Sequence, residues 1–141
     1  MRLIKVFACG KVLKNDLYER LKVLDLERVF PGCGDEFKLN RDWWVAIHKK
    51  TIVAYCGCLY SEGICIFVRA WVHKGYRGFG VQRQMIQARL RAATTKKCKT
   101  VITYTTYDNT HSANNLIKTG FLLYDPGYRW SGDMLYFKIH I

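Results

Sequence analysis

One stretch near the middle of the chain predicts a buried strand, a loop rich in glycine and cations, and an amphipathic helix in direct succession. The strand prediction rests on Ile64–Val72, a short apolar run dense in β-branched and aromatic residues. The helix prediction rests on Val81, Met85, Ala88 and Ala92, whose spacing places them on one stripe of an α-helix. We expect the rest of the chain to be arranged around this strand–loop–helix segment.

The loop of this segment has the features of a phosphate site. Gly75, Gly78 and Gly80 allow tight turns that point backbone N–H groups inward, and the start of the following helix adds partial positive charge. The Walker pattern does not fit because no Lys-Ser or Lys-Thr pair follows these glycines, and the dinucleotide fingerprint lacks its third glycine. A glycine-rich turn is also often a plain connection between a strand and a helix. A second motif is therefore needed to decide whether this loop binds phosphate.

The loop sequence from Arg77 to Gln82 resembles the acetyl-CoA loop of the GNAT acetyltransferases, usually written Q/R-x-x-G-x-G/A. Arg77 and Gly80 match this pattern, while Gln82 replaces the last small residue. Residues 109–121 resemble the family's second motif, an N-x-x-S/A helix that ends at a Gly-Phe pair. Because both motifs occur in the family's order with a strand between them, the resemblance covers about residues 42–140 and loosely the rest. It implies one small stand-alone GNAT domain over residues 1–141, of a kind typical of bacteria and their phages.

The resemblance implies acetyl-CoA as the co-substrate. Its pyrophosphate would lie on the loop, and its pantetheine arm would insert between the central strand and Thr100–Thr106. The oxyanion formed during transfer would accept a hydrogen bond from the backbone N–H of Trp71 or Val72. The cofactor-binding positions predicted in this way are Trp71, Val72, Arg77, Gly78, Phe79, Gly80, Val81, Gln82, Asn109 and Ser112.

The remaining elements follow from hydrophobic periodicity and turn residues. Asn15 or Asp16 is expected to cap the first helix, Asn109 is expected to cap the last one, and Gly120 to end it. The resulting βαβββαβαββ order predicts an α+β domain, and the resemblance implies a mixed, mostly antiparallel GNAT-like sheet of about six to seven strands, flanked by helices, with splayed central strands. Strands are expected at residues 3–8, 42–47, 51–60, 64–72, 100–106, 121–124 and 134–141, and helices at residues 17–24, 81–93 and 111–119.

Composition excludes several other classes of protein. Half of the residues are hydrophobic, which argues against a disordered chain. No apolar run approaches about 20 residues and no signal-peptide pattern follows Met1, so no membrane partner is expected and the predicted location is the cytoplasm. The six cysteines form no C-x-x-C pair, and Cys56 and Cys58 alone are too few ligands for a metal, so reduced thiols and no metal site are expected.

The predicted function is transfer of an acetyl group from acetyl-CoA to a primary amine of an unidentified acceptor. This chemistry needs a base that takes a proton from the amine and an acid that protonates the leaving thiolate. Leu116 stands where many family members have the tyrosine that acts as acid, so Tyr107 is the first candidate for proton donor. Glu62, Asp108 or His111 is the candidate base, since each lies near a strand end. The catalytic prediction is Tyr107 and Glu62 together with Arg69.

Arg69 is the single charged residue on the predicted central strand. A lone cation among apolar residues is costly unless it is paired or faces a polar cavity. Strand alternation places Arg69 on the same face as Phe67 and Trp71, and a bulge near Trp71 would bring the guanidinium to the place where acceptor and thioester meet. We therefore expect an acceptor with an anionic group. A salt bridge with Glu62 or Asp108 would instead make the arginine architectural.

Two alternative functions stay open, and the charge of the chain supports the first of them. The net charge is +12, and residues 63–107 contain nine Lys or Arg but no acidic residue. One alternative is a GNAT-fold protein that binds or modifies nucleic acid. The other is a catalytically inactive interaction protein, suggested by Leu116 in place of the family's tyrosine and by the lack of a carboxylate on the central strand. Whichever function applies, a monomer or a homodimer is expected. The cations and rings available to a nucleic acid are Arg83, Arg89, Arg91, Lys96, Lys97 and Lys99, with Trp43, Trp44, Tyr60, Tyr104, Tyr107, Tyr128 and Trp130.

Overall fold

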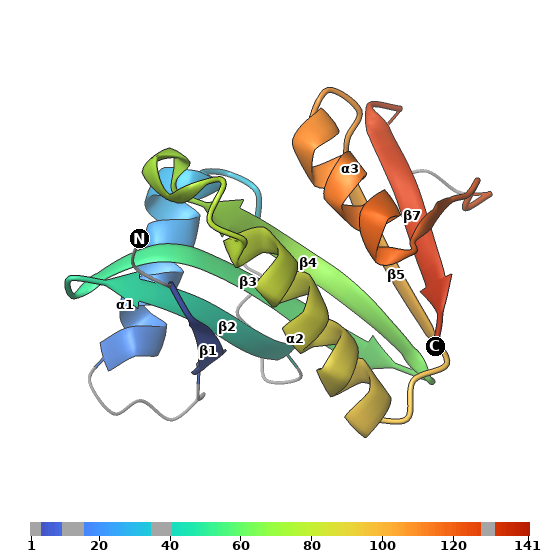
Figure 1. The fold of residues 1–141 in the computed structure, drawn as a ribbon, viewed down its shortest axis with the longest axis horizontal. Coiled ribbons are helices and arrows are strands. Elements are labelled where there is room, and N and C mark those ends of the chain that lie inside the picture. Colours follow the sequence, from blue (N-terminus) through green and yellow to red (C-terminus); the bar gives the residue numbers. More distant parts are fainter. Residues whose placement is uncertain (1–3, 10–15, 35–40, 128–131) are drawn as a thin grey trace. The chain divides into compact units, whose positions relative to one another are not determined.

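The computed structural model describes residues 4–9, 16–34, 41–127 and 132–141 (Figure 1). Its elements occur in the predicted order, with a π-helical turn (η2) and a 3-10 turn (η3) added. The elements are β1 (Val6–Cys9), α1 (Leu17–Val23), η2 (Leu24–Val29), β2 (Arg41–His48), β3 (Thr51–Ser61), β4 (Ile64–Val72), η3 (Lys74–Tyr76), α2 (Val81–Thr95), β5 (Thr100–Thr106), α3 (Thr110–Thr119), β6 (Leu122–Leu123) and β7 (Met134–His140).

The strands form one seven-stranded sheet in the order β1-β2-β3-β4-β5-β7-β6. The pairs β1–β2, β2–β3, β5–β7 and β6–β7 are antiparallel, and β4 pairs with β5 in parallel. The parallel register matches Ile64 with Thr100 and Ile66 with Ile102. The predicted α+β class and the mixed, mostly antiparallel sheet are therefore confirmed.

The chain divides into two compact units, which are described separately. The first unit contains residues 1–59 and 68–85, and the second contains residues 60–67 and 86–141. The single-domain prediction for residues 1–141 stays a prediction. Within the described residues, no helix combines the length and the apolar character needed to cross a membrane.

In the first unit, β2 and β3 form the predicted hairpin. Lys49 and Lys50 connect the strands with φ angles of 50° and 65°, so both residues lie in the left-handed region that two-residue hairpin turns require. The core around the hairpin includes Trp43 and Tyr55, each almost fully buried. The predicted cap at Asp16 is wrong, because this residue has a φ of 55° and its side chain makes no capping hydrogen bond. Asn15 lies outside the described residues.

In the second unit, β5 pairs with β7 along its whole length, from Thr100 opposite His140 to Thr106 opposite Met134. The predicted cap and C-terminal end of α3 are confirmed, and the helix begins at Thr110, one residue earlier than predicted. Asn109 Oδ1 accepts a hydrogen bond from the backbone N–H of Ser112 over 3.2 Å, as an N-cap does. Gly120 ends the helix in the left-handed conformation with a φ of 113°.

The helix α2 confirms the predicted stripe in part. Val81 and Met85 are buried in the first unit, and Ile86 and Ala93 are buried in the second. Arg89 is also buried, with only 2% of its surface exposed, and its guanidinium lies 3.9 Å from the centre of the Phe67 ring. The expectation that Arg89 contributes to a basic surface is therefore wrong, since the helix turns this side chain inward onto an aromatic face.

Candidate phosphate site and the Arg69 network

The glycine-rich loop lies in the first unit, between the end of β4 and the start of α2. Gly78 and Gly80 have φ angles of 86° and 80°, which side chains with a Cβ rarely adopt. A Cβ placed on either residue would meet no protein atom within 4 Å. The left-handed backbone, and not crowding by neighbouring residues, therefore requires glycine at these two positions.

Three hydrogen bonds fold the loop back on the end of β4. His73 Nδ1 accepts from the N–H of Gly75 at 3.0 Å, and the carbonyl of His73 accepts from the N–H of Tyr76 at 2.8 Å. Arg77 Nε donates to the carbonyl of Val72 over 3.4 Å. His73 is thus the cap of a 3-10 turn. This local role fits the ordinary behaviour of a polar side chain at a strand end.

Gln84 anchors the beginning of α2. Its Nε2 donates to the carbonyl of Ile4 over 2.7 Å, and its Oε1 accepts from the N–H of Val6 over 3.1 Å. The N–H of Gln84 itself donates to the carbonyl of Gly80 at 3.1 Å, which closes the first turn of the helix. The side-chain amide therefore satisfies backbone groups around β1 and fixes the helix that follows the loop. Nothing in the sequence pattern near Gln84 indicates this contact with residues about 80 positions earlier.

The loop and the first turn of α2 form an electropositive surface. Lys74, Arg77 and Arg83 are exposed, and the first turn of the helix contains no acidic residue. The N–H groups at the start of an α-helix have no partner within the helix, and the helix dipole adds positive charge there. This combination of N–H donors and cations suits a phosphate or pyrophosphate group.

The predicted cofactor-binding residues fall into two groups. One group lies in the first unit and consists of Trp71, Val72 and residues 77–82. Asn109 and Ser112 belong to the second unit, where they form the cap of α3. Their assignment to the cofactor stays a prediction.

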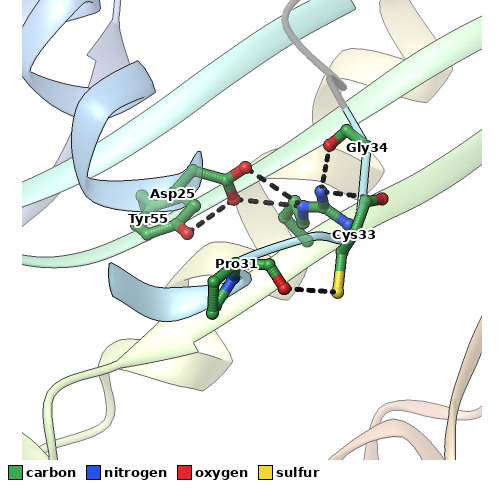
Figure 2. A network of polar contacts seen from close by, with 6 residues as sticks. Asp25, Pro31, Cys33, Gly34 and Tyr55 are labelled. Carbon is green, nitrogen blue, oxygen red and sulfur yellow. Dashed lines mark hydrogen bonds and ion pairs between the residues drawn. The ribbon is translucent and has the colours of Figure 1, made fainter. Parts of the chain in front are cut away.

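Arg69 takes part in a buried network in the first unit. Figure 2 shows the other members of this network, Asp25, Tyr55, Cys33 and Gly34. Its Nε donates to Asp25 Oδ1 over 3.0 Å, and its Nη2 donates to the carbonyl of Gly34 over 2.8 Å. The Tyr55 hydroxyl donates to the same Asp25 oxygen over 2.6 Å. The side chain of Asp25 is fully buried, and that of Arg69 is 9% exposed. The guanidinium also lies 4.8 Å from the centre of the Phe30 ring.

This network corrects the expectation that Arg69 offers a free guanidinium to an anionic acceptor. The ion-pair partner of Arg69 is Asp25 on the π-helical turn η2. The sequence had suggested Glu62 or Asp108 for this position. Arg69 itself has a left-handed backbone, with a φ of 45°, two residues before Trp71. The charge of Arg69 is already compensated inside the protein, so the inference of an anionic acceptor loses its basis.

Tyr55 is held in its neutral form by this environment. Burial, together with the hydrogen bond to Asp25 and the negative charge of that carboxylate, raises the pKa of Tyr55 far above its ordinary value. The hydroxyl therefore remains a hydrogen-bond donor to Asp25 at neutral pH. Tyr55 and Arg69 each donate a hydrogen bond to Asp25, which stabilises its charged form.

The other catalytic candidates lie in the second unit. Tyr107 is 62% exposed, and its backbone N–H donates to the carbonyl of Asp133 at 3.0 Å. Glu62 is exposed in the turn between β3 and β4, with a φ of 50°. Asp108 and His111 are exposed near the start of α3. The roles of Tyr107 and Glu62 stay predictions.

The described cysteines are free thiols, and no described group of three or more His, Cys, Asp or Glu side chains has the arrangement of a metal site. The thiol of Cys33 is exposed, while the others are buried. Burial raises the pKa of Cys9, which favours the protonated thiol over the reactive thiolate.

Residues 13–121 match the Acetyltransferase (GNAT) family, and the chain therefore belongs to that family. The match includes the loop, α2, β5 and α3. It confirms the family to which the two sequence motifs pointed.

Solved acetyltransferases share the fold at low sequence identity. One from Streptococcus agalactiae 2603 has a TM-score of 0.77 and 12% identity, and the match covers 100% of both chains. A GNAT family acetyltransferase from Elizabethkingia anophelis, solved with acetyl-CoA bound, has a TM-score of 0.74 and 14% identity, also over 100% of both chains. The PaiA N-acetyltransferase from Thermoplasma acidophilum, solved in complex with coenzyme A, has a TM-score of 0.65 and 13% identity, and the match covers 73% of this chain and 62% of that one. None of the curated proteins matches the sequence.

The tether between Gln84 and β1 can be tested by substitution. Gln84→Ala removes both side-chain hydrogen bonds, so we expect the free energy of unfolding to fall by about 1–3 kcal/mol and the amide of Val6 to exchange faster with solvent. Chemical denaturation and NMR-detected hydrogen exchange measure the two effects. Gln87→Ala is the matched control, because Gln87 is exposed on the same helix. Equal stability of the two variants would contradict the anchoring role.

Proposed function

We propose that this GNAT family member is an N-acetyltransferase that moves the acetyl group of acetyl-CoA to a primary amine of an acceptor. The observation that carries the proposal is the loop before α2, in which Gly78 and Gly80 are left-handed and the exposed neighbours are cationic. Coenzyme A carries a pyrophosphate, the group that this arrangement of donors and charges suits. Two fold neighbours, from Elizabethkingia anophelis and Thermoplasma acidophilum, were solved with acetyl-CoA and coenzyme A respectively, which supports the same ligand here.

In the proposed reaction, the amine nitrogen attacks the thioester carbonyl carbon of acetyl-CoA. The carbon–sulfur bond breaks, the nitrogen loses a proton to a base, and the leaving thiolate gains a proton. A backbone N–H of Trp71 or Val72 is the proposed donor to the oxyanion, since both residues lie at the end of β4 next to the loop. Tyr107 is the proposed donor to the thiolate.

A pair of variants at Gly80 tests the cofactor site. Gly80→Asp and Gly80→Asn have nearly the same size, and both side chains tolerate the left-handed backbone better than most. Only aspartate adds a negative charge beside the proposed pyrophosphate. We expect Gly80→Asp to weaken acetyl-CoA binding by about tenfold more than Gly80→Asn, which corresponds to roughly 1.4 kcal/mol of repulsion. Isothermal titration calorimetry of the folded variants measures the difference.

Two results of this titration count against the site. One is wild-type affinity for acetyl-CoA in a folded Gly80→Asp variant. The other is an equal loss of affinity in both variants, because strain of the backbone alone would then explain the effect.

The proton donor is tested by Tyr107→Phe. Loss of an acid that acts in the transition state should lower kcat by about 100-fold and leave KM for acetyl-CoA within about threefold of wild type. Chromatography measures the rate of coenzyme A release in the presence of an amine that the wild-type protein acetylates. This rate gives both kcat and KM. Tyr60→Phe is the control for removing a hydroxyl elsewhere in the second unit. An unchanged kcat in Tyr107→Phe would show that Tyr107 is not the proton donor, and that solvent or another hydroxyl protonates the thiolate.

Nucleic-acid binding is the second candidate, and one observation favours it. Arg91 of α2 is exposed, as are Lys96, Lys97 and Lys99, which follow the end of this helix at Thr95. Lys96 Nζ lies 5.4 Å from the centre of the Tyr60 ring. Cations at this end of a helix also offset the helix dipole, which explains them without a ligand. Acetyl transfer therefore ranks first. A salt-sensitive affinity for DNA or RNA that disappears when these cations are replaced would reverse the order.

A further inference from the structure

We propose that Asp25 is a positioning residue for acetyl transfer, acting through Arg69 on the backbone of residues 70–72 in β4. The proposal rests on the proposed function, because it concerns the part of β4 that contains the candidate oxyanion donors Trp71 and Val72. Asp25 is not a catalytic residue in this account. It holds the strand in the shape that the transfer needs.

The strand has an irregular backbone at Arg69. A φ of 45° is strained for a residue with a Cβ, and within a strand it interrupts the regular extended backbone. Phe67 and Val68 are adjacent and both buried, so both faces of β4 are covered just before Arg69. A change of Arg69 to an extended φ would redirect the chain that follows it, including the peptide planes of Trp71 and Val72. The direction of their N–H groups therefore depends on the conformation of Arg69.

The contacts of Arg69 hold it in this conformation. Asp25 accepts from Nε, and the carbonyls of Gly34 and Cys33 accept from Nη2 over 2.8 and 3.4 Å. Asp25 is itself fixed by the hydrogen bond from Tyr55. Figure 2 shows Asp25 and Tyr55 on one side of this network and Gly34 and Cys33 on the other. Because the ion pair is almost completely removed from water, loss of one charge leaves the other uncompensated.

Trp71 and Val72, which follow Arg69 in β4, contact both the network and the candidate cofactor loop. The ring of Trp71 lies 5.7 Å from that of Tyr55 and 6.0 Å from that of His73, measured between ring centres. Val72 accepts a hydrogen bond from Arg77 in the loop. A change in the conformation of Arg69 would therefore move the residues that join the network to the loop.

A role for Asp25 as the general base does not fit its surroundings. A base must reach the amine, directly or through one water molecule. The side chain of Asp25 is fully buried, and its Oδ1 already accepts from Tyr55 and from Arg69. The carboxylate is arranged to hold the guanidinium, so its effect on the reaction must pass through Arg69.

Two double variants separate positioning from simple stability. Asp25→Asn/Arg69→Gly and Asp25→Asn/Arg69→Ala both remove the two charges together, so neither leaves a buried charge unpaired. Glycine adopts a φ near 45° freely, whereas alanine does not. The two proteins therefore differ chiefly in whether residue 69 accepts the left-handed conformation.

We expect Asp25→Asn alone to lower kcat by about 100-fold, the effect of a misplaced reacting group. The double variant with glycine should recover to within about tenfold of wild type, while the one with alanine stays at the level of Asp25→Asn. Coenzyme A release from acetyl-CoA is measured with a panel of polyamines, amino acids and lysine peptides, using the amine that the wild-type protein acetylates fastest. Equal kcat in the two double variants would overturn the proposal.

A second measurement does not depend on activity. A positive φ places the amide and Hα protons of one residue close together, so residue 69 should show a strong intraresidue nuclear Overhauser effect in the wild-type protein and a weak one in Asp25→Asn. A strong effect in both proteins would overturn the role of Asp25. If the wild-type protein acetylates no amine in the panel, the proposed function fails in that assay, and this measurement alone decides whether Asp25 sets the shape of β4.

Discussion

The backbone N–H groups at the start of α2 are the constraint around which the site is organised. An α-helix leaves its first N–H groups without internal partners, and here they follow a loop that two left-handed glycines shape. Lys74, Arg77 and Arg83 add positive charge at the same place. A phosphate group satisfies both the donors and the charges, which links the local backbone to the chemistry of a family that uses coenzyme A.

Segments from the beginning of the chain support the central segment at two separate points. The backbone of Ile4 and Val6 binds Gln84 at the start of α2, and Asp25 binds Arg69 in the middle of β4. Both contacts involve polar groups that are partly or completely buried, where an unsatisfied partner is costly. The strand, the loop and the helix are therefore held in place by residues that contribute no part of the proposed phosphate site.

Local sequence was sufficient for most of the fold. The apolar run Ile64–Val72, the glycines after it and the cap at Asn109 each indicate a structure that depends on neighbouring residues, and the elements lie where these signals place them. The partner of Arg69 was not predictable in this way. Asp25 lies 44 positions earlier, on a π-helical turn that hydrophobic periodicity does not distinguish from an ordinary helix. The burial of Arg89 was not predictable either, because it depends on a tertiary contact with the Phe67 ring.

The most direct measurement is an NMR titration of the backbone amides with coenzyme A, with pantetheine as the matched ligand that lacks the pyrophosphate. If the loop and the first turn of α2 bind the pyrophosphate, coenzyme A should shift the amides of residues 78–82 strongly and pantetheine should leave them nearly unchanged. Two results would contradict the assignment of the pyrophosphate site to this loop. One is coenzyme A binding without a change in the chemical shifts of these amides, and the other is equal shifts with both ligands.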